Sequence, residues 1–184
     1  MKQKIKNKKT KEKFWEKNNG VDQNTGPWMN RILIGTPTTG LIRYEWATAR
    51  FGQITPTNWS AVHMTQHIPS YAPLQFLLSD AENLVAKALV EGNFEYLLFW
   101  EEDNIPPIDA FVRLNEYMIE GKVPIVGGLY FTKSNPPEPM TYRGRGTGSF
   151  QDFKLGEKVW VDGLAFGFTL IHASIIRALW EISS

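Results

Sequence analysis

Apolar and polar positions follow two alternating periods along this chain. Short apolar runs of the kind that form buried strands cover residues 31–35, 59–68, 96–100 and 123–131. Apolar residues at helical spacing predict helices over residues 41–51, 74–90, 106–120 and 172–182. Gly92 and Gly121 are expected to end the second and third helices. A long loop rich in Pro, Gly and charge is expected over residues 132–156, before extended structure restarts at 159–161.

This alternation predicts the fold class. Strands that alternate with helices favour a mostly parallel sheet with helices on both faces, which is a three-layer α/β/α sandwich. The chain has 184 residues, of which 42% are hydrophobic and 13% aromatic, as is typical of one globular domain. We expect that domain over residues 27–184, after a tail over residues 1–26.

The tail carries most of the positive charge. Residues 1–20 contain eight Lys and two Glu, a net charge of +6, so the rest of the chain carries −5 of the total of +1. A solvated, disordered leader is expected, and contact with nucleic acid or an anionic membrane is the alternative. The tail lacks the apolar segment of a signal peptide, and no stretch reaches the ~20 apolar residues of a membrane span. With no Cys in the chain, these features predict a cytoplasmic protein without a transmembrane segment.

Three adjacent acids, residues 101–103, follow the predicted strand over residues 96–100. In extended backbone, Glu101 and Asp103 share one face. Two carboxylates on one face favour a Mg²⁺ or Mn²⁺ site, because these ions take oxygen ligands and often bind one or two protein carboxylates plus the phosphates of a nucleotide. In the alternative interpretation, Asp103 or Asn104 caps the helix that opens at Pro106.

The loop Gly35–Gly40 follows the first predicted strand in the same way. Ligands of such sheets bind at the carboxyl ends of strands, so this loop and the three acids are expected to form one site. The loop matches neither a phosphate-binding P-loop nor a dinucleotide fingerprint. As an alternative, Thr38 or Thr39 caps the next helix.

Residues 81–130 resemble the nucleotide-binding half of the GT-A glycosyltransferases, most closely the family-two type. The resemblance rests on an ordered series: Asn83 in a helix, then ALVEGNFEYLLFW, EED, NIPP and IVGGLYF. The later segment VDGLAFGFTLIHASIIRAL is similar to the family's Gly-rich turn and following helix. Together these segments cover about two thirds of the chain.

The resemblance implies a GT-A-like fold and transfer of a sugar from a nucleotide-diphosphate donor to an unidentified glycan, lipid or protein acceptor, with no nucleic-acid partner. It implies that a Mn²⁺ or Mg²⁺ ion is held by Glu101 and Asp103. The donor would contact these two acids, Asn83 and the loop residues Thr36, Pro37 and Thr38.

The chain departs from the family pattern at three points. Glu101 stands where Asp is usual, and Glu82 stands where Arg is frequent. The second acidic motif and the late metal ligand are not found in residues 1–184, so Asp162 is the candidate general base or acceptor-binding group. A structural turn is the alternative role for Asp162.

Several other residues have a functional and an ordinary interpretation. His63 and His67 have the spacing of a helical zinc pair but lie in a predicted strand, so a packing or surface role is expected. His172 is expected to cap or pack, with metal binding as the alternative. The loop over residues 143–148 is either a polar loop tip or a cationic lid over a diphosphate, and Trp160 belongs to the core or stacks on a sugar.

Two other function classes stay open. One is a nucleotide-sugar-binding domain without turnover. The other is a metal-dependent nuclease or nucleotidyltransferase, which needs a nearby Lys or a basic cleft.

Overall fold

The computed structural model describes residues 31–59, 68–144 and 148–183. The tail and the pair His63 and His67 therefore lie outside the described residues, and so does most of the strand predicted over residues 59–68. Trp59 itself ends a 3-10 turn, Thr57–Trp59, and is fully buried.

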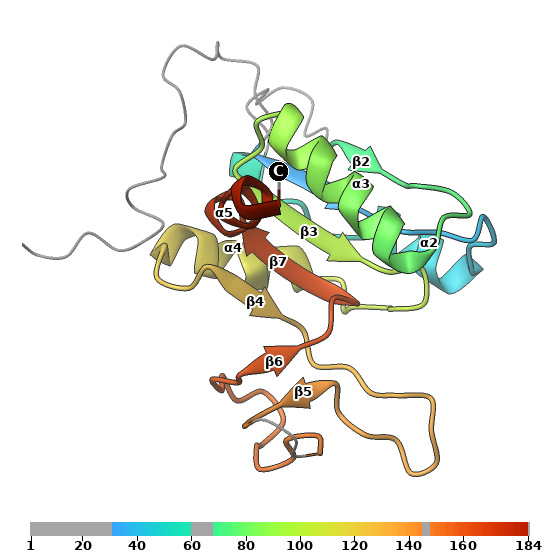
Figure 1. Ribbon diagram of the computed structural model, residues 1–184. Coiled ribbons are helices and arrows are strands. Elements are labelled where there is room, and N and C mark those ends of the chain that lie inside the picture. Colours follow the sequence, from blue (N-terminus) through green and yellow to red (C-terminus); the bar gives the residue numbers. More distant parts are fainter. Residues whose placement is uncertain (1–30, 60–67, 145–147, 184) are drawn as a thin grey trace, which may run out of the picture.

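A five-stranded sheet forms the middle of the molecule (Figure 1). Its order is β2-β1-β3-β7-β4. The strands are β1 (Ile32–Gly35), β2 (Ser70–Tyr71), β3 (Tyr96–Trp100), β4 (Ile125–Gly127) and β7 (Phe168–His172). β1 pairs in parallel with β2 and β3, whereas β7 runs antiparallel to both β3 and β4. The sheet is thus mostly parallel, with one reversed strand inside it.

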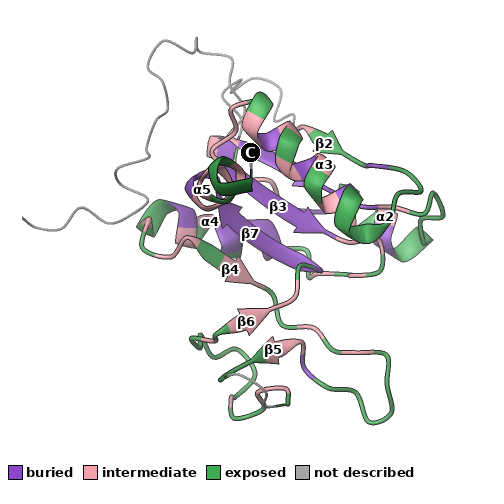
Figure 2. Ribbon diagram, viewed as in Figure 1, coloured by how far each residue is buried: buried purple, intermediate pink, exposed green. Residues whose placement is uncertain are grey.

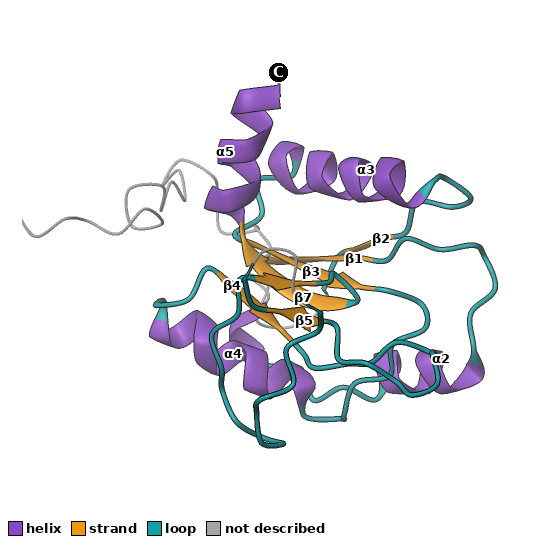
Figure 3. Cartoon of the chain, turned by 60° about the horizontal axis from the view of Figure 1, so that its bottom comes forward, coloured by secondary structure: helices purple, strands orange, loops and turns teal. Residues whose placement is uncertain are grey.

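Helices cover both faces of this sheet (Figure 3). The helices α3 (Leu78–Glu91) and α5 (Ala173–Ser183) lie on one face, and α2 (Tyr44–Phe51) and α4 (Ala110–Glu120) lie on the other. Alternate residues of β3 enter two separate cores. Leu98 and Trp100 pack with α2 and α4, and Leu97 and Phe99 pack with α3 and α5. The predicted α/β class and its three layers are confirmed.

A small second sheet, β5 (Thr141–Tyr142) with β6 (Gly163–Leu164), lies below the main sheet in Figure 1. This part of the chain is mostly half-buried or exposed, in contrast to β3 and β7 (Figure 2). The sequence predicted extended structure over residues 159–161, but the strand in this region, β6, covers Gly163–Leu164 instead. None of the helices in the described ranges is long and apolar enough to cross a membrane.

The predicted strand over residues 96–100 is confirmed residue for residue, whereas three helices begin later than predicted. α2 starts at Tyr44 rather than residue 41. α3 starts at Leu78 because Leu74 continues the parallel pairing of β1 and β2 through a bridge to Thr38. α4 starts at Ala110 because the carbonyl of Pro107 accepts bonds from Gln53 and Ala110.

The strand β7 was missed by the sequence prediction, which described this segment as a Gly-rich turn before a helix. All five of its residues are buried. β7 ends at His172 and α5 begins at Ala173, with no Gly or Pro between them. The helix was predicted to within one residue, whereas the apolar residues before it were not recognised as a strand. The predicted strand over residues 123–131 is also shorter than expected, since β4 covers three residues.

Candidate functional site at the carboxyl end of β3

Glu102 joins the two loops that the sequence predicted to share a site. Its carboxylate accepts hydrogen bonds from Thr38 Oγ1 at 2.5 Å and from Thr39 Oγ1 at 2.7 Å. The backbone N–H of Thr39 donates to the same carboxylate at 3.1 Å. Burial acts to raise the pKa of Glu102, but the bonds from Thr38 and Thr39 outweigh it and lower that pKa. The carboxyl ends of β1 and β3 are thus held together by an ionised side chain.

Glu101 and Asp103 do not lie in the extended backbone that was expected, because the N–H of Asn104 donates to the Glu101 carbonyl at 3.2 Å and closes a turn. Asp103 pairs with Lys133, whose Nζ lies 2.8 Å from Oδ2, and its Oδ1 accepts a bond from Asn104 Nδ2 at 3.0 Å. Burial raises the pKa of Glu101, and the negative charges of Asp103 and Glu82 raise it further, while Lys133 acts in the opposite direction. The ionised form of Glu101 is therefore disfavoured where it stands.

The alternative of an acidic helix cap is wrong for these residues. The N-cap position of α4 is Asp109, and its side chain makes no capping bond. The same holds for the loop after β1. α2 has Arg43 at its N-cap position, so neither Thr38 nor Thr39 caps it. Thr38 instead accepts the backbone N–H of Gly40 within the loop.

Glu101 and Asp103 lie close enough for the charge of Asp103 to raise the pKa of Glu101. Among residues 31–59, 68–144 and 148–183, no group of three or more His, Cys, Asp or Glu is arranged to hold an ion. Two carboxylates are nevertheless the usual protein contribution to a Mg²⁺ site that a nucleotide completes with its phosphates.

Gly167 and Tyr130 support the turn from the side of β7. The N–H of Glu101 donates to the carbonyl of Gly167 at 3.0 Å, and the N–H of Gly167 donates to the Tyr130 hydroxyl at 2.8 Å. A Cβ on Gly167 would lie 2.5 Å from Tyr130 Cζ and 2.6 Å from Asn104 Nδ2. A side chain at this position would require Tyr130 and Asn104 to move away from the turn. Sequence reasoning missed Gly167, Tyr130 and Lys133 because each acts on the carboxylates from a distant part of the chain.

The other predicted donor contacts are spread around this edge. Thr36 is buried, and its N–H bonds to Tyr71 in the extension of the β1–β2 ladder. Pro37 is buried and Thr38 is half-buried, so Thr38 is the member of the trio that reaches the carboxylates. Asn83 is exposed on α3, whereas its neighbour Glu82 is close enough to affect the pKa of Glu101.

Asp162 lies in the small second sheet. Its Oδ2 accepts the backbone N–H of Gly144 at 2.7 Å, and its own N–H bonds to the Tyr142 carbonyl at 2.9 Å. The side chain is therefore engaged in a turn. Arg143 donates to the Trp160 carbonyl and stacks 3.9 Å from the centroid of Phe150. Residues 145–147 of the predicted lid lie outside the described ranges.

His172 is buried at the opposite end of the sheet. Its Nδ1 bonds to Ser174 Oγ at 2.8 Å, and its ring packs edge-on against Tyr96 with the centroids 4.9 Å apart. The packing role predicted for His172 is confirmed, and the metal alternative is wrong, because β3 and β7 separate it from Asp103 by their full length. Trp160 is exposed, so its predicted core role is wrong.

The fold was compared with those of solved structures. The crystal structure of A197 from STIV superimposes with a TM-score of 0.56 at 17% sequence identity, covering 80% of this chain and 67% of that chain. No protein-family model matches the sequence, and no curated protein sequence matches it either. At this identity the likeness supports a shared α/β fold and nothing finer.

Proposed function

We propose that this chain is a GT-A-like glycosyltransferase that takes a sugar from a nucleotide-diphosphate donor. The observation that carries the proposal is the pair Glu101 and Asp103 at the carboxyl end of β3, beside the Thr38–Thr39 loop that Glu102 binds. The ordered sequence resemblance and the mostly parallel sheet with reversed β7 support it. An edge of this kind is where α/β sheets bind nucleotides.

The proposal assigns a role to each group. Glu101 and Asp103 hold a Mn²⁺ or Mg²⁺ ion together with the donor phosphates. The ion supplies Lewis-acid chemistry, neutralising the charge that develops on the leaving diphosphate. Glu102 fixes the loop against which the nucleoside packs, with Thr38 at its centre. Lys133 pairs with Asp103 and would offset part of the negative charge of the carboxylates and the donor phosphates.

Binding without turnover is the second candidate, and the environment of Asp162 favours it. A general base must lie within hydrogen-bond reach of the acceptor hydroxyl. Asp162 lies directly before β6 of the small second sheet, where its Oδ2 accepts the N–H of Gly144, and not at the carboxyl end of β3. A metal-dependent nuclease is less well supported, although Lys133 meets one of its requirements.

Donor hydrolysis tests the proposal. A panel of uridine, guanosine and thymidine diphosphate sugars is incubated with the chain and Mn²⁺, and release of nucleotide diphosphate is measured. We expect slow release from one donor, lost in Asp103→Asn and retained in the control Asp152→Asn, which alters an exposed acid of the long loop. No release from any donor, with donor binding intact, would establish the binding function instead. Cleavage of DNA would establish the nuclease.

The role of Asp162 is tested in the same assay. If it is the base, Asp162→Ala should lower turnover by about 10²–10⁴-fold and leave donor affinity unchanged. Turnover equal to that of the parent chain would assign Asp162 to the turn alone.

A further inference from the structure

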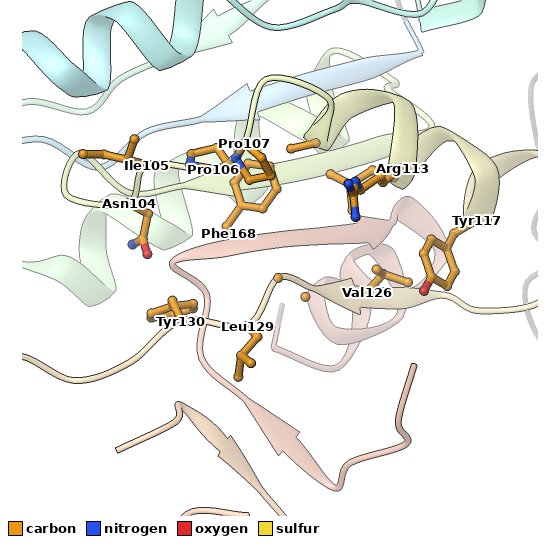
Figure 4. A pocket seen from close by; sticks show the side chains of 14 residues that line it. Asn104, Ile105, Pro106, Pro107, Arg113, Tyr117, Val126, Leu129, Tyr130 and Phe168 are labelled. Carbon is orange, nitrogen blue, oxygen red and sulfur yellow. The ribbon is translucent and has the colours of Figure 1, made fainter. Parts of the chain in front are cut away.

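A cavity of about 390 Å³ lies between α4 and β4 (Figure 4). Most of its lining is apolar and comes from three segments. These residues are Pro106, Pro107, Leu114, Val126, Leu129 and Phe168. The volume lies within the range of small-molecule sites. It is separate from the Thr38–Thr39 loop, since its walls come from the α4 and β4 side of the sheet.

Glycine opens this cavity at its floor. β4 ends in Gly127 and continues into Gly128, and both line the cavity. A Cβ on Gly128 would stand 3.2 Å from Phe168 Cδ1, so the ring of Phe168 would have to give way. Phe168 lies beneath these glycines in the core, with only 6% of its surface exposed, so the walls that a ligand can contact are mainly Pro107, Val126 and Leu129.

The cations beside the cavity are already paired. Arg113 reaches Asp109 with Nη2 at 2.7 Å and with Nε at 2.8 Å. Lys158 lies 4.4 Å from the centroid of Tyr117 and 3.9 Å from the carboxylate of Glu116. The charge of Arg113, which lines the cavity, is thus matched by that of Asp109, and most of the remaining lining is apolar. The cavity therefore suits an uncharged molecule with an apolar body.

One end of the cavity lies beside the turn over residues 101–104, which carries Glu101 and Asp103. Asn104 and Tyr130 both line it, and each is bonded to that turn. Asn104 Nδ2 donates to Asp103 at 3.0 Å, and the Tyr130 hydroxyl accepts the N–H of Gly167, whose carbonyl binds Glu101. A molecule that fills the cavity would thus place its exposed end beside Asp103 and Glu101.

We propose that this cavity binds the acceptor, and that the acceptor is a neutral molecule carrying a hydroxyl group next to an aromatic or compact apolar body. The apolar body lies against Val126, Leu129 and the ring of Tyr117. The hydroxyl lies at the Asn104 end, where the carboxylates are. The claim that the bound molecule is the acceptor rests on the proposed glycosyltransferase function. The claim that such a molecule binds in the cavity does not rest on it.

Two glycosides that differ only in their apolar group test this proposal without any donor. Phenyl and methyl β-D-glucopyranoside are titrated into the full chain, and backbone amide shifts are followed by NMR. We expect the phenyl compound to bind about tenfold more tightly or better, because only it buries apolar surface. The largest shifts should fall on Gly127, Gly128, Leu129 and the first turns of α4.

Two variants with matched controls locate the site. Tyr117→Ala should weaken the phenyl compound by about three- to tenfold, whereas Tyr44→Ala, at an exposed position of α2, should not. Ile105→Asp places a charge at a residue that lines the cavity, and it should weaken binding. Ile108→Asp, an equally exposed change in the same loop but outside the lining, is its control.

Equal affinity for the two glycosides would overturn the proposal. So would shifts that fall on the exposed apolar residues Leu41, Leu74 and Leu77 instead. If the phenyl compound binds in the cavity while no nucleotide diphosphate binds, the cavity stands and the transferase function fails. The reverse result would retain the donor site and refute the acceptor site.

Discussion

The two ends of β3 differ in how well their charged side chains are paired. At the amino end, Arg31 reaches both carboxylate oxygens of Glu95, at 2.5 and 3.0 Å, and the hydrogen bond raises the pKa of Arg31 against the effect of burial. At the carboxyl end, burial and its acidic neighbours raise the pKa of Glu101. Lys133, the cation that acts on Glu101 and Asp103, has a side chain that is 74% exposed.

This difference indicates that the charged groups at the amino end stabilise the fold, whereas those at the carboxyl end are available for function. The pair at the amino end is matched one to one and joins β1 to β3. The carboxylates at the carboxyl end outnumber their cation, which is unfavourable for the folded chain alone. A bound cation with phosphates would remove that excess. The comparison can be tested at each end separately.

The largest effect on stability is expected at the amino end. Glu95→Gln leaves Arg31 half-buried without its anion, so the free energy of unfolding should fall by about 2–3 kcal/mol. Urea unfolding measures it. Glu91→Gln is the matched control, because Glu91 pairs with Lys87 in an exposed contact at 3.7 Å, and it should cost less than about 0.5 kcal/mol. If both variants lost the same free energy of unfolding, the pair of Arg31 with Glu95 would be no more important for stability than an exposed pair.

The second effect is a pH dependence at the same end. Burial lowers the pKa of His172, so the folded state prefers the neutral ring. The resulting stability is complete above the ordinary histidine pKa of about 6.5 and is lost as the pH falls through the lower folded value. Between the two values the slope is at most about 1.4 kcal/mol per pH unit. Melting curves should show this acid loss in the parent chain and a smaller one in His172→Gln. Identical curves would contradict it.

The carboxyl end should show the opposite sign. The raised pKa of Glu101 means that its ionised form opposes folding at neutral pH, and this penalty disappears as the pH falls below the ordinary glutamate value of about 4.3. Glu101→Gln should therefore stabilise the chain at pH 7, by roughly 0.5 kcal/mol. The advantage should be absent at about pH 3.5. Loss of stability at pH 7 would show that ionised Glu101 is a structural group.

The smallest effect is expected from Lys133. Its exposed pair with Asp103 contributes at most about 1 kcal/mol. Lys133→Met should free Asp103 and tighten Mn²⁺ binding by up to about fivefold in the absence of nucleotide, as measured by the paramagnetic signal of free Mn²⁺. Lys122→Met, at an exposed position after α4, is the control. Weaker Mn²⁺ binding in Lys133→Met would mean that the lysine assists the ion.

Much of this site followed from local sequence. The apolar run Tyr96–Trp100 and the acids after it are adjacent in the chain, so their period and position were enough to predict a strand end with a site. That the loop after β1 lies beside these acids followed from topology, since parallel strands bring their carboxyl ends together. The bond from Thr38 to Glu102 was not predicted, because Glu102 was expected to face away from the site.

What the sequence could not predict depends on distant pairing. β7 reverses direction inside a mostly parallel sheet, and its place between β3 and β4 is set by contacts with both. Gly167 leaves room for Tyr130 and Asn104, which meet there only in the folded chain, and Lys133 reaches Asp103 from a loop 30 residues later. No local period carries that information. The bond from the Gly144 N–H to Asp162 likewise depends on the pairing of β5 with β6, which no local pattern predicts.

The most direct test of the central claim is Mn²⁺-dependent binding of a nucleotide diphosphate, measured by calorimetry with uridine and guanosine diphosphate. The account predicts that one of them binds the parent chain, and that a chelator or Asp103→Asn weakens it by at least about tenfold, as loss of a charged ligand does. Asp152→Asn should bind like the parent chain. Affinity that is the same with and without chelator, or the same in Asp103→Asn, would contradict a metal and nucleotide site at the carboxyl end of β3.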